Sequence, residues 1–127
     1  MFETGDVVRF FSPIAGKEKF HLCLGRDDAG NVLVFLHLNS DFGYRGDCVL
    51  NDGRIPGLPR SRTGKSVVSF SVVVRMGTER LQKFGAEKTG EIDVSVAEEL
   101  LVFARKVQVL TGLERALVVS AFQRYLK

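Results

Sequence analysis

The sequence predicts an α+β fold in which a small curved sheet or barrel carries helices on one side. The first two thirds of the chain consist of short segments rich in Val, Phe and Leu, separated by Gly, Pro, Asp and Asn. The last third switches to helical periodicity. Because strands come first and helices last, without alternation, a parallel βαβ sheet is excluded. A chain of 127 residues fits one domain, with the sheet over about 5–94 and C-terminal helices over about 95–126.

The individual elements follow from local patterns. Five strands are expected at 6–11, 19–25, 32–39, 47–50 and 66–74, and a helical turn at 78–84. Ser95 followed by Glu98, and Thr111 followed by Glu114, have the spacing of capping boxes and predict the starts of two helices. Residues 51–65 contain too many Gly and Pro residues for a strand and are expected to form a long exposed loop.

Composition narrows the functional classes. The N-terminus lacks the basic start and apolar run of a signal peptide, and no apolar run is long enough for a transmembrane helix. We therefore expect a cytoplasmic protein that makes no membrane contact, with Cys23 and Cys48 as buried, reduced thiols. Two His and two Cys, widely dispersed, do not predict a metal site. The net charge of +3 is weak evidence for nucleic-acid binding by itself.

The long loop carries the densest positive charge of the chain. No acidic residue lies between residues 54 and 65, while four cations do: Arg54, Arg60, Arg62 and Lys65. One interpretation is a flexible basic arm over a phosphate-bearing ligand, and the other is a solvated, mobile loop.

The stretch VFLHLNSDF, residues 34–42, contains His, Ser and Asp side chains but does not predict a catalytic triad. Alternate residues of a strand face opposite sides, so His37 and Ser40 point apart. If 27–30 form a four-residue hairpin loop, His21 faces Leu36 and lies on the side of Ser40. Lys17 and Lys19 share that side, at the open end of the hairpin, and a slip of one residue reverses the assignment.

A basic side chain, a histidine and a hydroxyl at one strand end suit metal-independent RNA cleavage. That reaction needs a base for the 2′-OH proton, an acid for the leaving oxygen and cations for the phosphorane. Arg45 and Arg75 are candidate phosphate clamps, the alternative being ordinary surface arginines.

Several segments together resemble the PemK/MazF toxin family. Gly5-Asp6 before the first strand, Gly16-Lys17-Glu18 before the second and LHLNS at the end of the third match short motifs of that family. The similarity continues through the strand at 66–74 and the short helix to about residue 113, and the final helix is an addition. One departure is clear, because the Arg-Pro pair that opens the family's second strand is replaced here by the sequence KFH.

The resemblance implies an SH3-like barrel that forms a homodimer, is held inactive by an antitoxin peptide and cleaves single-stranded RNA without a cofactor. It places Ser40 at the strand-end hydroxyl, Asn39 beside it, and Lys19 or His21 near the catalytic arginine. The leading hypothesis is therefore an endoribonuclease. Its catalytic candidates are Lys19, His21, Ser40 and Arg75, and its substrate-binding candidates are Asn39, Arg45, Arg54, Arg60, Arg62 and Lys65.

Two alternatives stay open. The first is a non-catalytic small-barrel module that binds nucleic acid or peptide, which the missing Arg-Pro pair favours. The second is an interaction domain whose C-terminal helices form a dimer face.

Overall fold

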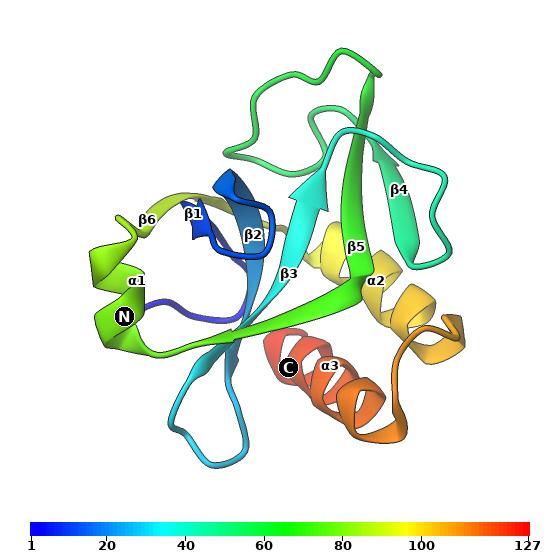
Figure 1. Ribbon diagram of the computed structural model, residues 1–127. Coiled ribbons are helices and arrows are strands. Elements are labelled where there is room, and N and C mark those ends of the chain that lie inside the picture. Colours follow the sequence, from blue (N-terminus) through cyan, green and yellow to red (C-terminus); the bar gives the residue numbers. More distant parts are fainter.

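A computed structural model of residues 1–127 has an α+β architecture, with a six-stranded antiparallel sheet and three helices (Figure 1). Every strand predicted from the residues is present, and the edge strand β6 adds a sixth. The elements in chain order are β1 Asp6–Ser12, β2 Lys17–Arg26, β3 Leu33–Asn39, β4 Asp47–Asn51, β5 Lys65–Met76, α1 Thr78–Lys83, β6 Glu87–Glu91, α2 Val94–Lys106 and α3 Gly112–Tyr125.

The sheet is strongly bent but not closed. Its strand order is β4-β5-β3-β2-β1-β6, so β4 and β6 are edges and no strand ladder joins them. The bend lies in β5, whose pairing with β3 jumps from Val73 to Ser69 between Leu36 and His37. Such bulges increase the local twist and let one long strand serve two parts of a curved sheet. The expected closed barrel is therefore not confirmed, whereas the curved antiparallel sheet is.

The loop between β4 and β5, residues 52–64, crosses from one edge of the sheet to the other; we call it the crossing loop. Ile55 is buried in the core at 2 % exposure, and Leu58 packs against that core. The loop backbone then reaches β6, where a Cβ added at Gly57 would lie 2.6 Å from the Thr89 carbonyl. A Cβ at Gly90 would meet the Pro56 carbonyl in the same way. Only glycine allows two backbones to approach so closely.

Each face of the sheet packs against its own hydrophobic cluster. The larger cluster lies between the sheet and the two C-terminal helices, which Figure 1 shows side by side on one side of the sheet. The smaller one includes Phe10, Cys23 and Phe35 on the other face, together with Leu81 of α1. Cys23 and Cys48 are buried free thiols, as predicted. No helix combines the length and the apolar character needed to cross a membrane.

The observed starts of α2 and α3 show which of the two predicted capping boxes is present. Thr111 and Glu114 form the reciprocal box that opens α3, so this prediction is confirmed. The box at Ser95 is wrong, because α2 begins earlier. Its N-cap is Asp93, whose carboxylate accepts the Val96 backbone N–H at 2.9 Å. Either side chain type can cap a helix, and here the aspartate two residues upstream does so.

Candidate functional site

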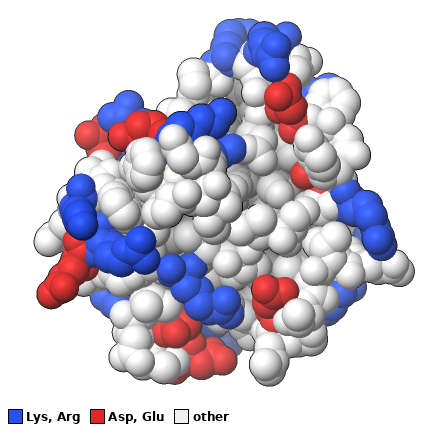
Figure 2. Space-filling view, in the orientation of Figure 1, with Lys and Arg blue, Asp and Glu red and all other residues white.

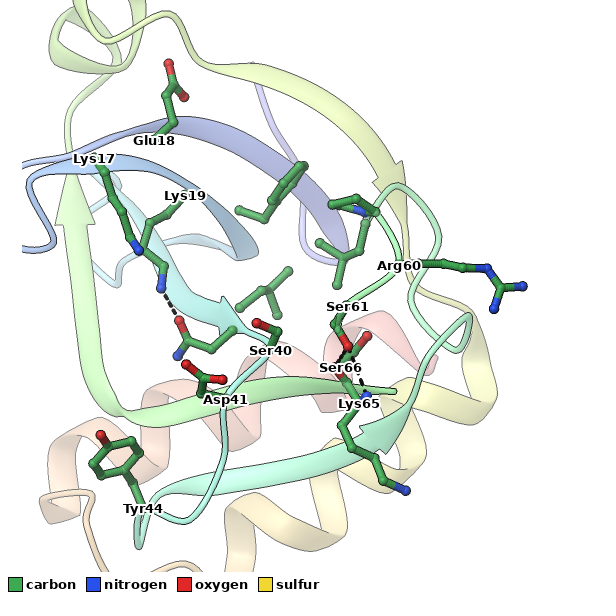
Figure 3. Close-up of a pocket in the computed structure, with 15 residues that line it drawn as sticks. Lys17, Glu18, Lys19, Ser40, Asp41, Tyr44, Arg60, Ser61, Lys65 and Ser66 are labelled. Atoms are coloured by element: carbon green, nitrogen blue, oxygen red, sulfur yellow. Dashed lines mark hydrogen bonds between the residues drawn. The ribbon is translucent and has the colours of Figure 1, made fainter. Parts of the chain in front are cut away.

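A cavity of about 450 Å³ lies at the open end of the β2–β3 hairpin, away from its turn (Figure 3). Its walls come from the start of β2, the end of β3, the loop 40–46, the crossing loop and the start of β5. Fifteen residues line it, of which four are hydrophobic. Such a mostly polar concavity suits a charged or hydrogen-bonding ligand more than an apolar one. We call it the lysine cavity, after Lys17 and Lys19 of its wall.

The hairpin register differs from the predicted one by one residue. His21 is paired with His37 rather than with Leu36, and Phe20 is paired with Leu38. The cause is a connection of six residues, 27–32, instead of four, combined with a bulge between Cys23 and Gly25. Because a slip of one residue moves every side chain to the other face, the predicted strand face shared by Ser40 with Lys17, Lys19 and His21 is wrong. Lys19 instead lies beside Asn39, to which it is hydrogen-bonded.

His21 instead packs against the smaller cluster. It is fully buried, and its ring stacks on Phe10 with centroids 3.7 Å apart and planes inclined by 6°. The ring of His37 lies 5.1 Å away. Neither nitrogen of His21 has a hydrogen-bond partner, although the backbones of Val8 and Lys19 are near. Burial and the neighbouring His37 lower the pKa of His21 to about 3, so its imidazole is neutral. The side chain is also not among those that line the cavity.

Lys17 and Lys19 form the positive wall of the cavity. In Figure 3 their side chains run together, and the Lys19 ammonium donates a hydrogen bond to the Oδ1 of Asn39. Neither lysine takes part in an ion pair. Burial, and secondly the charge of Lys17, lower the pKa of Lys19, while Asp41 acts in the opposite direction. The two ammonium groups therefore repel each other at a partly desolvated site.

Hydroxyl groups also line the lysine cavity. Ser40, Tyr44, Ser61 and Ser66 all line it. The hydroxyl of Ser40 makes no hydrogen bond within the protein, whereas its backbone carbonyl accepts one from the Thr63 hydroxyl at 2.6 Å. The Ser61 and Ser66 hydroxyls are bonded within the protein, so a ligand that accepts hydrogen bonds finds the lysine ammonium groups and the unbonded hydroxyls of Ser40 and Tyr44 in one cavity.

The crossing loop, by contrast, is held by its own polar residues. The Asp52 carboxylate accepts the backbone N–H of Ser61 at 3.1 Å and the hydroxyl of Ser66 at 3.3 Å. Two of its arginines are ion-paired: Arg54 with Glu99 at 2.7 Å, and Arg62 with Asp41 at 3.1 Å. The loop is therefore anchored at both ends rather than being a free arm.

Arg60 of the crossing loop and Lys65 at the start of β5 border the cavity, but their charged ends point away from the lysine pair. Figure 3 shows Arg60 directed outward from the rim and Lys65 directed away from the lysine pair. The Lys65 ammonium donates to Asn51 at 2.7 Å. Both residues border the cavity, and Arg54 and Arg62 do not.

Two further candidates lie elsewhere. Arg75 is paired with Val34, near the other end of β3, and Ser40 follows six residues later, so roughly 20 Å of strand separates them. The arginine is exposed and does not line the cavity, so the structure does not place it beside Ser40. Arg45 is exposed in the loop 40–46 and also lies outside the lining.

The structure thus brings together five of the predicted site residues and adds others. Lys19, Asn39, Ser40, Arg60 and Lys65 line the cavity, as do the additional residues Lys17, Asp41, Tyr44, Ser61 and Ser66. The signal for Tyr44 was available in the sequence, because SDFGYRGD places two aromatic residues in a polar, glycine-containing connection. The position of Ser61 depends on the fold of the crossing loop and has no local signal.

Charge elsewhere on this side of the molecule is mixed. Figure 2 shows Lys and Arg atoms interspersed with Asp and Glu atoms, without a continuous basic stripe. No group of three or more His, Cys, Asp or Glu side chains is placed to hold a metal ion. Comparisons with protein-family models, curated proteins and solved structures gave no match.

Proposed function

We propose that this chain binds single-stranded RNA, with a backbone phosphate held between Lys17 and Lys19. The observation that supports it most is the lysine pair itself, two ammonium groups without carboxylate partners on the wall of a polar cavity. The resemblance of the β2 and β3 segments to PemK/MazF toxins supports RNA as the source of that phosphate.

The electrostatics of the pair favour an anion. Burial, and secondly repulsion from Lys17, lower the pKa of Lys19, so keeping both lysines charged raises the free energy of the empty protein. A phosphate oxygen that accepts hydrogen bonds from both ammonium groups offsets the repulsion between them. Part of that free energy therefore favours binding of the phosphate. The free hydroxyl of Ser40 supplies a further donor.

Metal-independent RNA cleavage is the second candidate, and one observation favours it. Lys19, with its lowered pKa, and Ser40, with its free hydroxyl, line the same cavity. In cleavage the 2′-oxygen forms a bond to phosphorus, the bond to the 5′-oxygen breaks, a base takes the 2′-OH proton and an acid protonates the leaving oxygen. Both histidines are buried outside the lining, so the cavity offers Lys19 but no imidazole for these transfers. RNA binding is therefore the primary proposal. A homodimer and an antitoxin peptide partner are proposed only together with the second candidate, RNA cleavage.

Equilibrium binding to a labelled RNA tests the proposal. The probe is a mixed-sequence, unstructured RNA of about 12 nucleotides, and fluorescence anisotropy is measured over a range of salt concentrations. We expect Lys17→Ala/Lys19→Ala to weaken binding about 30-fold and to reduce the salt slope by about 1.4. The matched control is Lys83→Ala/Lys106→Ala, which removes the same charge from exposed helix ends outside the cavity.

Equal losses in the two double variants would contradict the proposal, because they would show that only net charge matters. A separate incubation in EDTA tests cleavage. Fragments that end in a cyclic phosphate, and that the Lys19→Ala variant does not produce, would establish the second candidate; intact RNA would reject it.

A further inference from the structure

Two large aromatic side chains are exposed in the connection between β3 and β4, residues 40–46, which we call the cavity loop. Tyr44 is 74 % exposed and lines the lysine cavity, and Phe42 is 51 % exposed. Neither ring stacks on another aromatic side chain of the protein. Most other phenylalanines are buried or packed against the two clusters, so these exposed rings stand apart.

The backbone that carries Tyr44 is fixed. Its N–H donates to the Asp47 carboxylate at 3.0 Å, and its carbonyl accepts the Asp47 N–H at 3.2 Å. Two residues later the Gly46 carbonyl accepts the Phe70 N–H at 2.8 Å. A Cβ at Gly46 would lie 2.7 Å from the backbone nitrogen of Ser71, so the loop is docked closely on β5. The ring is therefore held at the cavity by an anchored loop.

We propose that Tyr44 is a stacking platform for an unpaired RNA base whose phosphate is bound by Lys17 and Lys19. This inference rests on the proposed function and identifies the form of nucleic acid that the cavity accepts. A base face is available to a protein ring only where the strand is unstacked, so duplex RNA is excluded from this subsite.

The arrangement of side chains lets Tyr44 stack on a base while Lys17 and Lys19 bind a phosphate in the same cavity. Figure 3 places Tyr44 near Asp41, on the side of the cavity that carries the lysine pair. Stacking on an aromatic ring tolerates any base, because every base has a π face. Tyr44 therefore contributes affinity for single strands, while the sequence preference has to come from polar groups around it.

Affinity measurements with two substitutions separate stacking from other contacts. Tyr44→Leu keeps an apolar side chain but removes the ring, and it should weaken RNA binding about tenfold. Tyr44→Phe keeps the ring and should bind within about twofold of the wild type. The matched control is Leu113→Ala, which removes an exposed apolar side chain of α3 outside the cavity. At the position that stacks, replacing the base by an abasic site should weaken RNA binding by the wild type but not by Tyr44→Leu.

The chain also provides an intrinsic reporter, because it contains two tyrosines and no tryptophan. Tyr125 donates its hydroxyl hydrogen bond to the Ile92 carbonyl at 2.6 Å, away from the cavity. Unlabelled RNA should quench the tyrosine emission of the wild type and of Tyr125→Phe, and should leave that of Tyr44→Leu unchanged.

Each outcome decides the inference. If Lys17→Ala/Lys19→Ala weakens binding but Tyr44→Leu does not, stacking is overturned while the proposed function stands. If Tyr44→Phe is as weak as Tyr44→Leu, the hydroxyl makes the contact and stacking is again overturned. A wild-type protein that binds no RNA overturns both.

Discussion

The two basic regions of this protein differ in whether their charges already have partners within the fold. In the crossing loop, Arg54 and Arg62 are ion-paired with Glu99 and Asp41, and Lys65, which follows the loop at the start of β5, is hydrogen-bonded to the Asn51 amide. At the start of β2, Lys17 and Lys19 have no carboxylate partner. The loop has more cations in the sequence, yet the strand pair has more charge available to a ligand.

Charge density along the sequence therefore does not identify the anion site of this protein. Loop cations next to acidic side chains of other elements stabilise the loop and are partly neutralised. Two lysines at alternate positions of one strand, by contrast, are held together by the strand itself and remain mutually repulsive. Substitutions in the crossing loop and at His21 of β2 measure how firmly each region is held.

The largest effect is expected where the crossing loop meets β6. Gly90→Ala places a methyl group against the Pro56 carbonyl and within about 2.9 Å of the Gly57 nitrogen, so the loop has to move. We expect a loss of about 3 kcal/mol in the free energy of unfolding, measured by urea denaturation. Gly112→Ala is the control, because a Cβ there meets nothing within 4 Å and alanine favours the helix. A Gly90→Ala variant as stable as wild type would show that the loop does not depend on this contact.

The next effect is expected at the Asp52 carboxylate. Asp52→Ala leaves the Ser61 N–H and the Ser66 hydroxyl without their acceptor, at partly buried positions. Stability should fall by about 2 kcal/mol. Amide hydrogen exchange should increase in residues 52–64 more than in the rest of the sheet. Asp28→Ala, at an exposed hairpin position, should change neither quantity.

A pH-dependent effect is expected from His21, two residues from Lys19 but buried. The folded pKa of His21, about 3, lies below its ordinary value of 6.5, so the unfolded chain takes up the proton first as the pH falls. The contribution of His21 is therefore complete above about pH 6.5 and is lost progressively toward about pH 3. Between about pH 7.5 and about pH 5.5 the wild type should lose about 1.4 kcal/mol through this group.

The substitution His21→Phe isolates that loss. It keeps a ring on Phe10 and removes two nitrogens that lack partners. The variant should lose correspondingly less stability over the same pH range in urea denaturation. His37 acts in the same direction in both proteins, because burial lowers its pKa too. Identical pH profiles for the variant and the wild type would contradict the neutral, buried state of His21.

The smallest effect is expected from the loop arginine that is already paired. Arg54→Ala breaks the bond to Glu99, but both side chains are partly exposed, so stability should change by about 0.5 kcal/mol or less. A thermal unfolding scan measures it, with Glu99→Ala as the reciprocal variant. A change several times larger would mean that this pair anchors the loop more than Asp52 does.

The features that depend on local sequence patterns were predicted correctly in most cases. The strand positions, the helix start at Thr111 and the reduced cysteines depend on neighbouring residues or on burial of an apolar segment, and all three predictions are confirmed. The helix start at Ser95 was misplaced because Asp93 has equal capping ability and lies nearer to the preceding strand. Local signals cannot rank two such caps.

The site was only partly predictable because bulges set the register. The bulge between Cys23 and Gly25 moves His21 to the opposite face from the one expected. The bulge in β5 separates the half that pairs with β4 from the half that carries Arg75. Neither bulge leaves a mark in the alternation of apolar residues. Lys19 and Ser40 were found because they sit at strand ends, where the cavity opens on either register.

The most direct test of the account compares the two basic regions in one binding experiment. Lys17→Ala/Lys19→Ala and Arg54→Ala/Arg62→Ala each remove two positive charges, and both are titrated with the same single-stranded RNA at the same salt concentration. We expect a loss of about 30-fold for the lysine pair and less than about threefold for the arginine pair. Equal losses, or a larger loss for the arginines, would contradict it.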